Sequence, residues 1–221
     1  MNDAGWKVVA VGTANAGKSS LLSALADQRE LFASGERPYL TSNFQNYRLG
    51  KLHLIDTPAF RGEARDEELA EWVNRRADTI LWCHSLRQGE LHADELAALS
   101  RLLRHQGTSA KLRLVLTRAD DLASAETVFT VSDTIAKQMK TVFGLETAPH
   151  TVGVSLYWRA VEIMDRQRQR AKGRWLGLCR PCTWRRLHRK FDERQRESGI
   201  PGLRELLHEL AESHDEQKKQ Q

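Results

Sequence analysis

The octet GTANAGKS at residues 12–19 constrains the fold of this chain more than any other feature. It is a full match to the pattern G-x-x-x-x-G-K-[ST]. An apolar stretch, residues 7–11, precedes it, and a stretch with leucines at helical spacing begins at Lys18. A loop of this kind between a strand and a helix directs backbone N–H groups at phosphate oxygens. The sequence therefore predicts a nucleotide-binding protein.

The residues of this loop have different expected roles. Lys18 is predicted to reach the β- and γ-phosphates and to take part in catalysis, and the Ser19 hydroxyl is predicted to ligate Mg²⁺. The other positions of this segment that are expected to contact the nucleotide are Gly12, Asn15, Ala16, Gly17 and Ser20.

Two carboxylates follow apolar strands further along the chain. Asp56 ends the strand predicted for residues 52–55, where a carboxylate can hold Mg²⁺ through water. Asp120 follows the strand predicted for residues 112–116. A carboxylate can accept two hydrogen bonds at once from the ring N–H and the amino group of guanine, and adenine offers no such pair. Asp120 is therefore predicted to select guanine.

A fourth strand is predicted for residues 151–154 and ends at Ser155. The carboxyl ends of parallel strands meet at one edge of a sheet. A backbone N–H at Ser155 is therefore expected to meet the carbonyl oxygen of guanine.

These four segments resemble, in order and position, the motif set of the translation-factor-related GTPases, in their Era-like and dynamin-like branches. The resemblance covers roughly residues 6–155 and again residues 199–212. It implies a GTPase that uses GTP, GDP and Mg²⁺ and switches between its GTP and GDP forms. The family's motifs also imply nucleotide contacts from Ala59, Thr117, Arg118, Ser155 and Leu156.

Three of these motifs depart from the commonest pattern. Ala59 stands at the Gly of Asp-x-x-Gly, and Ser155-Leu156-Tyr157 replaces Ser-Ala-Lys. Thr117 and Arg118 replace the first two residues of Asn-Lys-x-Asp. Threonine still offers a hydroxyl, and the arginine stem can lie over the base as a lysine stem would. Guanine binding is therefore still expected.

Phe60 stands where Ras-like enzymes have the glutamine that orients the attacking water, and a phenyl ring cannot do this. Hydrolysis must then draw on the backbone, the metal or another group. In Era-like members an asparagine at the position of Asn15 helps to bind a potassium ion, which gives Asn15 a catalytic role and makes K⁺ a candidate cofactor. The alternative is a turn residue. His84, at a predicted strand end, is a candidate catalytic helper or a buried histidine.

Two segments are expected to sense the γ-phosphate. Residues 29–42 show neither helical nor strand periodicity and precede the strand predicted for residues 44–49. Thr41 in this loop is predicted to complete the Mg²⁺ ligands, with Ser42 as the alternative. The second segment is residues 57–65, ahead of a predicted helix with Leu69, Trp72 and Val73 on one face. Both loops are expected to change order with the γ-phosphate.

Composition predicts one soluble, cytoplasmic domain, and the resemblance implies that residues 1–155 and 199–212 form it as a GTPase domain. The chain has 221 residues, three cysteines, a mean hydropathy of −0.55 and no apolar run of membrane-spanning length. Predicted helices over residues 90–104 and 127–142 alternate with the strands. The expected fold class is α/β, a mainly parallel sheet with helices on both faces and a helical basic insertion.

The insertion is expected at residues 156–198. It carries 13 Lys and Arg against 5 Asp and Glu, a charge of +8, whereas the rest of the chain carries −3. Helical spacing predicts an arm of two helices with a turn at residues 175–182, followed by a last helix over 201–212 and a polar tail over 213–221.

Three interpretations of the arm remain open. In the first interpretation, the apolar stripes of the arm pack on the GTPase domain and its arginines are solvated. Alternatively, its arginines and tryptophans contact RNA or the ribosome, or an acidic membrane surface, which would place the protein peripherally at a membrane. Self-association, as a nucleotide-dependent dimer, is a further candidate for completing the catalytic site. The rival to a GTPase is a GTP-binding module with little or no hydrolysis.

Overall fold

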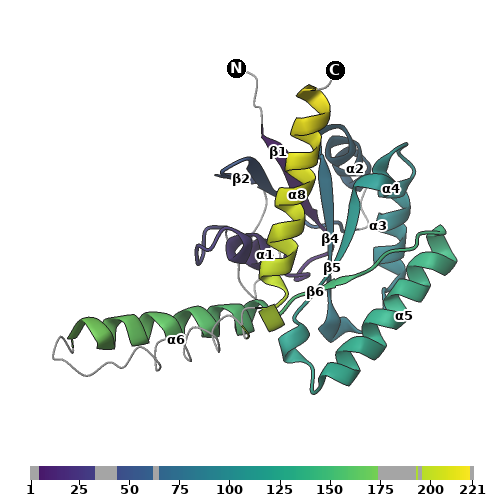
Figure 1. Ribbon diagram of the computed structural model, residues 1–221. Coiled ribbons are helices and arrows are strands. Elements are labelled where there is room, and N and C mark those ends of the chain that lie inside the picture. Colours follow the sequence, from purple (N-terminus) through teal and green to yellow (C-terminus); the bar gives the residue numbers. More distant parts are fainter. Residues whose placement is uncertain (1–4, 33–43, 62–64, 174–192, 194–195, 220–221) are drawn as a thin grey trace.

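The computed structural model describes residues 5–32, 44–61, 65–173, 193 and 196–219. Strands and helices alternate along the chain (Figure 1). The strands are β1 (Trp6–Val11), β2 (Gln45–Leu49), β3 (Leu52–Asp56), β4 (Thr79–Ser85), β5 (Leu112–Thr117) and β6 (His150–Thr151). The helices are α1 (Lys18–Leu25), α2 (Arg65–Arg76), α3 (Ala93–Leu103), α4 (Thr108–Lys111), α5 (Ala125–Phe143), α6 (Val154–Gly173) and α8 (Ile200–Lys219), with short 3-10 helices η1 (Leu86–Gln88) and η2 (Ala119–Asp121).

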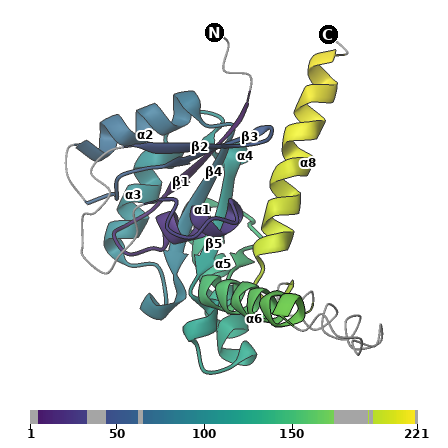
Figure 2. The same cartoon turned by 90° about the vertical axis from the view of Figure 1, so that its left-hand side faces the viewer.

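The strands form one sheet in the order β2-β3-β1-β4-β5-β6. β2 is antiparallel to β3, and every other pair is parallel. The predicted α/β class with a mainly parallel sheet is confirmed. Figure 2 shows α8 on one side of this sheet and α2 and α3 on the other.

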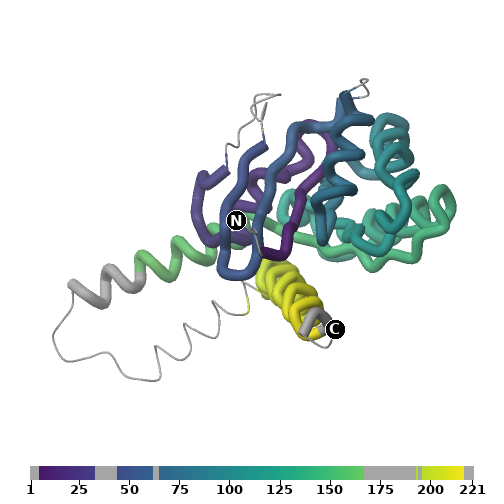
Figure 3. Tube along the Cα trace, turned by 90° about the horizontal axis from the view of Figure 1, so that it is seen from above, coloured from purple at the N-terminus to yellow at the C-terminus, as the bar shows by residue number. Residues whose placement is uncertain are grey.

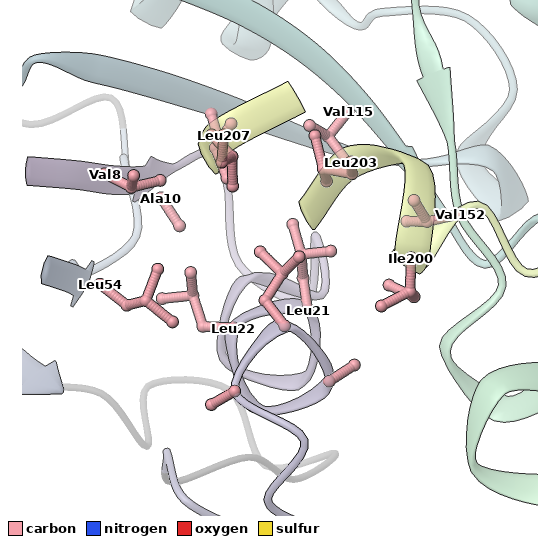
Figure 4. Close-up of a cluster of buried hydrophobic side chains, with 14 of the residues drawn as sticks. Val8, Ala10, Leu21, Leu22, Leu54, Val115, Val152, Ile200, Leu203 and Leu207 are labelled. Atoms are coloured by element: carbon pink, nitrogen blue, oxygen red, sulfur yellow. The ribbon is translucent and has the colours of Figure 1, made fainter. Parts of the chain in front are cut away.

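Side chains of the central strands alternate between the two faces, as the strand repeat requires. Val8 and Ala10 of β1 belong to the cluster that includes α1 and α8, whereas Val9 and Val11 belong to the cluster that includes α2, α3 and α5. Figure 4 shows the first cluster, which gathers side chains from β1, β3, β5, α1 and α8. Full burial of one leucine contributes about 2 kcal/mol. The two clusters therefore hold the carboxyl ends of the strands in a fixed array.

The predicted fourth strand over residues 151–154 is wrong beyond Thr151, because the chain turns at Gly153. The Gly153 N–H donates to the Ser198 carbonyl oxygen (2.9 Å) instead of extending the sheet, and α6 begins at Val154. A contact with a residue so far along the chain leaves no local pattern. Ser155 and Leu156 thus lie in the first turn of a helix.

The last helix is longer than the predicted 201–212. α8 continues to Lys219, so residues 213–219 of the predicted polar tail belong to this helix. Its final turns contact the far end of the sheet, where His214 packs edge-on against Trp6 and Asp215 pairs with Lys51 (3.1 Å). These contacts stabilise a helix that polar residues alone would leave marginal.

Helix α6 projects away from the sheet, and Figures 1 and 3 show this from two directions. It supplies the first of the two predicted arm helices. The predicted turn at residues 175–182 and most of the second helix lie outside the described residues. In the part of the chain that the structure describes, no helix is long and apolar enough to cross a membrane.

Candidate nucleotide-binding site

The phosphate loop lies between β1 and α1 and is shaped by two glycines. Gly12 has φ 146°, and a Cβ there would lie 2.4 Å from the carbonyl oxygen of Cys83. Gly17 has φ 83°, and a Cβ there would lie 3.0 Å from Oγ1 of Thr117. Both positions therefore require glycine, for conformation and for space.

Lys18 is 7% exposed and is the first residue of α1, at the end of this loop. Its Nζ donates to the carbonyl oxygens of Thr13 (2.8 Å) and Gly12 (3.2 Å). Burial lowers the pKa of Lys18, and the nearby Cys83 and Asp56 oppose that shift. A phosphate in the loop would offset the cost of burying this charge.

The two predicted metal ligands of the described chain lie together. Oγ of Ser19 donates to Oδ2 of Asp56 at 2.6 Å, and Asp56 is fully buried at the end of β3. A hydroxyl and a carboxylate oxygen at this spacing are the hard donors that suit Mg²⁺. The third predicted ligand, Thr41, and its alternative Ser42 lie outside the described residues.

Asn15 lies at the exposed turn of the loop with φ 61°. Asparagine tolerates this left-handed conformation better than most residues. The conformation agrees with the turn interpretation, and a contact with potassium stays a prediction. Of the other predicted positions, Ala16 is buried in the loop and Ser20 is half-buried in α1.

Phe60 meets the loop through its backbone. Its N–H donates to the Gly12 carbonyl oxygen (3.1 Å), while its side chain is 3% exposed and packs against Trp82. The phenyl ring is therefore part of the core, and the adjacent Ala59 is half-buried.

Thr117 joins the predicted guanine segment to the phosphate loop. Its Oγ1 lies 2.8 Å from the carbonyl oxygen of Ala16 and 3.2 Å from that of His84. The hydroxyl thus forms a buried link across the site. Arg118 has φ 58° and pairs with Asp121 (3.7 Å), so its predicted position over the base stays a prediction.

Asp120 lies at η2 and faces the start of α6. Its Oδ2 accepts a hydrogen bond from the Leu156 N–H (2.7 Å), and Ser155 is exposed beside it. A Cβ on Gly153 would approach Cβ and Cγ of Asp120 to 3.1 Å. The predicted base site is thus formed by η2 and a helix N-terminus.

His84 has a buried partner that no sequence motif indicated. Nδ1 of His84 lies 2.9 Å from Oε1 of Glu95, and Nε2 lies 2.9 Å from the Gly89 carbonyl oxygen. Oγ1 of Thr13, in the phosphate loop, donates to the same Glu95 oxygen (3.3 Å). Because a carbonyl only accepts, Nε2 of His84 donates to the Gly89 carbonyl oxygen, and Nδ1 faces the Glu95 carboxyl group. His84 is fully buried. This agrees with the prediction of a buried histidine, which was the alternative to a catalytic helper.

A family model for 50S ribosome-binding GTPases matches residues 7–118. The chain is 26% identical over 157 residues to the probable GTP-binding protein EngB of Acinetobacter baylyi, an alignment that covers 66% of each protein. The chain therefore spans slightly less than two thirds of that relative.

Two solved structures share the fold. Toc33 from Arabidopsis thaliana in complex with GDP and Mg²⁺ matches with a TM-score of 0.54 and 20% identity, covering 68% of this chain and 71% of that chain. Era in complex with MgGDPNP and nucleotides 1506–1542 of 16S ribosomal RNA matches with a TM-score of 0.54 and 19% identity, covering 67% and 50%. With its phosphate loop, its sheet order and the family match, this chain belongs to the 50S ribosome-binding GTPase family of GTP-binding P-loop proteins.

Proposed function

We propose that the protein is a Mg²⁺-dependent GTPase that hydrolyses GTP to GDP and phosphate and acts as a nucleotide-dependent switch. The observation that carries this proposal is the contact of Ser19 Oγ with Asp56 Oδ2 at 2.6 Å, beside the buried Lys18. Ser19, Asp56 and Thr41 would hold Mg²⁺, whose charge offsets that of the phosphate oxygens. Lys18 would exchange its carbonyl partners for the β- and γ-phosphates.

Guanine selection rests on Asp120, whose carboxylate accepts from the ring N–H and the amino group of the base. Thr117 fixes the relation between this carboxylate and the phosphate loop through Ala16. The remaining nucleotide contacts that we propose come from Gly12, Asn15, Ala16, Gly17, Ser20, Ala59, Arg118, Ser155 and Leu156.

Hydrolysis must proceed without a polar side chain at position 60, because the Phe60 ring lies in the core. We propose that Asn15 recruits a potassium ion that supplies part of the missing charge. The buried ring equally favours the rival function, a GTP-binding module with little or no hydrolysis. A GTPase and a GTP-binding module would differ in their rate of GTP turnover, whereas both would bind the nucleotide.

For the arm we propose contact with RNA, with an acidic membrane surface as the competing partner. The support is the charge of +8 over residues 156–198. A phosphate backbone attracts such a segment strongly at low salt. The location proposed with this function is the cytoplasm.

The test is multiple-turnover hydrolysis of GTP and of ATP with Mg²⁺, in potassium and in sodium, for the wild type and Lys18→Ala. Turnover of GTP only, lost in Lys18→Ala and raised by potassium, supports the GTPase and the role of Asn15. Equal rates in the two salts remove the role of potassium. Tight GTP binding without turnover establishes the binding module instead.

A further inference from the structure

Helix α6 begins at the predicted base site and continues outward as the arm. Its Leu156 N–H donates to Oδ2 of Asp120 (2.7 Å), while its other end lies far from the sheet (Figures 1 and 3). One helix therefore carries both a partner of the predicted guanine reader and the arm. The position of its first turn decides where the Asp120 carboxylate points.

Tyr157 is the next residue and fixes that first turn on α1. Its hydroxyl donates to Oδ1 of Asp27 (2.6 Å), and Arg204 of α8 donates both to that hydroxyl (3.2 Å) and to the Ala24 carbonyl oxygen (2.9 Å). The Tyr157 side chain is 1% exposed within the cluster that includes α1 and α8. A buried hydroxyl with two charged partners holds a narrow range of positions.

A second contact joins α6 to the beginning of the loop predicted to sense the γ-phosphate. Arg29 pairs with Glu162 (2.5 Å), and its guanidinium lies 5.3 Å from the centroid of the Trp158 ring. Both charged groups are substantially exposed, at 52% and 40%, so this pair is the weaker of the two anchors.

The turn after α1 has an unusual backbone. Asp27 has φ 55° and Glu30 has φ 57°, both in the left-handed region. This conformation places the Asp27 carboxylate within hydrogen-bond distance of the Tyr157 hydroxyl. Arg29 follows two residues later in the same turn. The chain accepts local backbone strain at the point where α6 is held.

The other side of the same corner is fixed independently. The Gly153 N–H donates to the Ser198 carbonyl oxygen (2.9 Å), and a Cβ on Gly153 would lie 3.1 Å from Asp120, so a larger residue there would require Asp120 to shift. The part of this corner that these contacts do not hold is the first turn of α6. The contacts of Tyr157 fix the position of that turn.

We propose that Tyr157 is a positioning residue for guanine selection, and that α6 thereby couples the arm to the nucleotide. The Tyr157–Asp27 hydrogen bond holds the first turn of α6 so that Leu156 keeps Asp120 aimed at the base. A partner that displaces the arm would then lower the affinity of the site for guanine nucleotides. The inference rests on the proposed function, because it requires Asp120 to bind guanine.

The experiment compares GDP with IDP, which lacks the exocyclic amino group that would donate a hydrogen bond to Asp120. Dissociation constants are measured by competition against a fluorescent GDP for the wild type, Asp120→Asn, Tyr157→Phe, Asp27→Ala and Asp27→Asn. Lys137→Ala on the exposed face of α5 is the control. Thermal unfolding is recorded for every variant.

Asp120→Asn is expected to abolish the preference for GDP over IDP. Tyr157→Phe and Asp27→Ala should reduce that preference about tenfold, the effect of misplacing one charge-assisted hydrogen bond. Asp27→Asn keeps an acceptor for the tyrosine hydroxyl and should keep most of the preference, as should Lys137→Ala. General loosening of the fold would instead weaken GDP and IDP equally.

The outcomes separate the two claims. A wild type without preference for GDP, or an Asp120→Asn variant that keeps it, removes the proposed guanine site. If Asp120→Asn loses the preference but Tyr157→Phe and Asp27→Ala keep the wild-type ratio, the role of Tyr157 is overturned. Should Tyr157→Phe fail to fold, Asp27→Ala decides, because Asp27 is exposed and its replacement leaves the core intact.

Discussion

The hydroxyl of Thr117 lies 2.8 Å from the carbonyl oxygen of Ala16 and joins the end of β5 to the phosphate loop. Both residues are buried, at 1% exposure. The two segments that should contact the base and the phosphates are thus held together by one side chain. A threonine performs this at the position where the commoner motif has asparagine.

Thr117→Val removes the hydroxyl and keeps the shape of the side chain. The buried carbonyl oxygen of Ala16 then loses this donor, so the free energy of unfolding should fall by about 1–3 kcal/mol. GDP affinity should fall with it, because the loop loses its link to β5. Urea denaturation and GDP titration measure the two effects, and Thr117→Ser serves as the control. Unchanged stability in the valine variant would show that the contact contributes little.

Gly12→Ala places a methyl group against the backbone of Cys83, where 2.4 Å is available. Neither the loop nor β4 can move without disturbing the sheet, so the variant should lose more than about 4 kcal/mol of stability. Gly107→Ala is the matched control: it also has positive φ (79°) and lies in the left-handed helical region, but a Cβ there meets no described atom within 4 Å. It should lose only about 1–2 kcal/mol. Equal melting temperatures for the two variants would contradict this.

Phe60→Gln introduces the residue that Ras-like enzymes use, but into the core. The variant would lose the packing of the phenyl ring on Trp82 and would bury a polar amide. The free energy of unfolding should therefore fall by about 3–5 kcal/mol, and GTP turnover should not rise. Phe60→Leu, which stays apolar, should lose less than half as much. Single-turnover hydrolysis and thermal unfolding give both numbers. Faster turnover in the glutamine variant would mean that position 60 reaches the phosphates.

Burial, and then the hydrogen bond to Asp27, raise the pKa of Tyr157 to about 12. The folded protein therefore keeps this proton at a pH where the unfolded chain has lost it, above about 10. The resulting contribution to stability is complete below pH 10 and is lost as the pH rises from 10 to 12. The stability difference between the wild type and Tyr157→Phe should narrow over that interval. Urea denaturation at pH 9 and pH 11 tests this, and a constant difference would contradict the shift.

The phosphate loop and the central strands could be predicted because their signals are local. The phosphate loop is recognised from consecutive residues, 12–19. β1 and β5 are apolar runs of ordinary strand length. Asp56 and Asp120 then follow from their places at strand ends. The contact of Ser19 with Asp56 is a consequence of the parallel pairing of β1 with β3.

The features that the sequence did not reveal depend on distant contacts. The end of β6 is set by Gly153 and Ser198, and the length of α8 by its contacts with Trp6 and Lys51. Glu95 lies 82 positions from Thr13, and its sequence context is that of an ordinary first helical turn. Such pairs have no periodicity or motif that would single them out.

The corner at Gly153 bears on how this protein could diversify. The chain leaves the domain there and returns at Ser198, and the two residues are joined by a 2.9 Å hydrogen bond. The entropy of closing a loop rises only slowly with its length once its ends are fixed together. The first turns of α6, as far as Val161, pack on the core. The segment that follows them can be lengthened, shortened or exchanged while the GTP-binding domain keeps its shape.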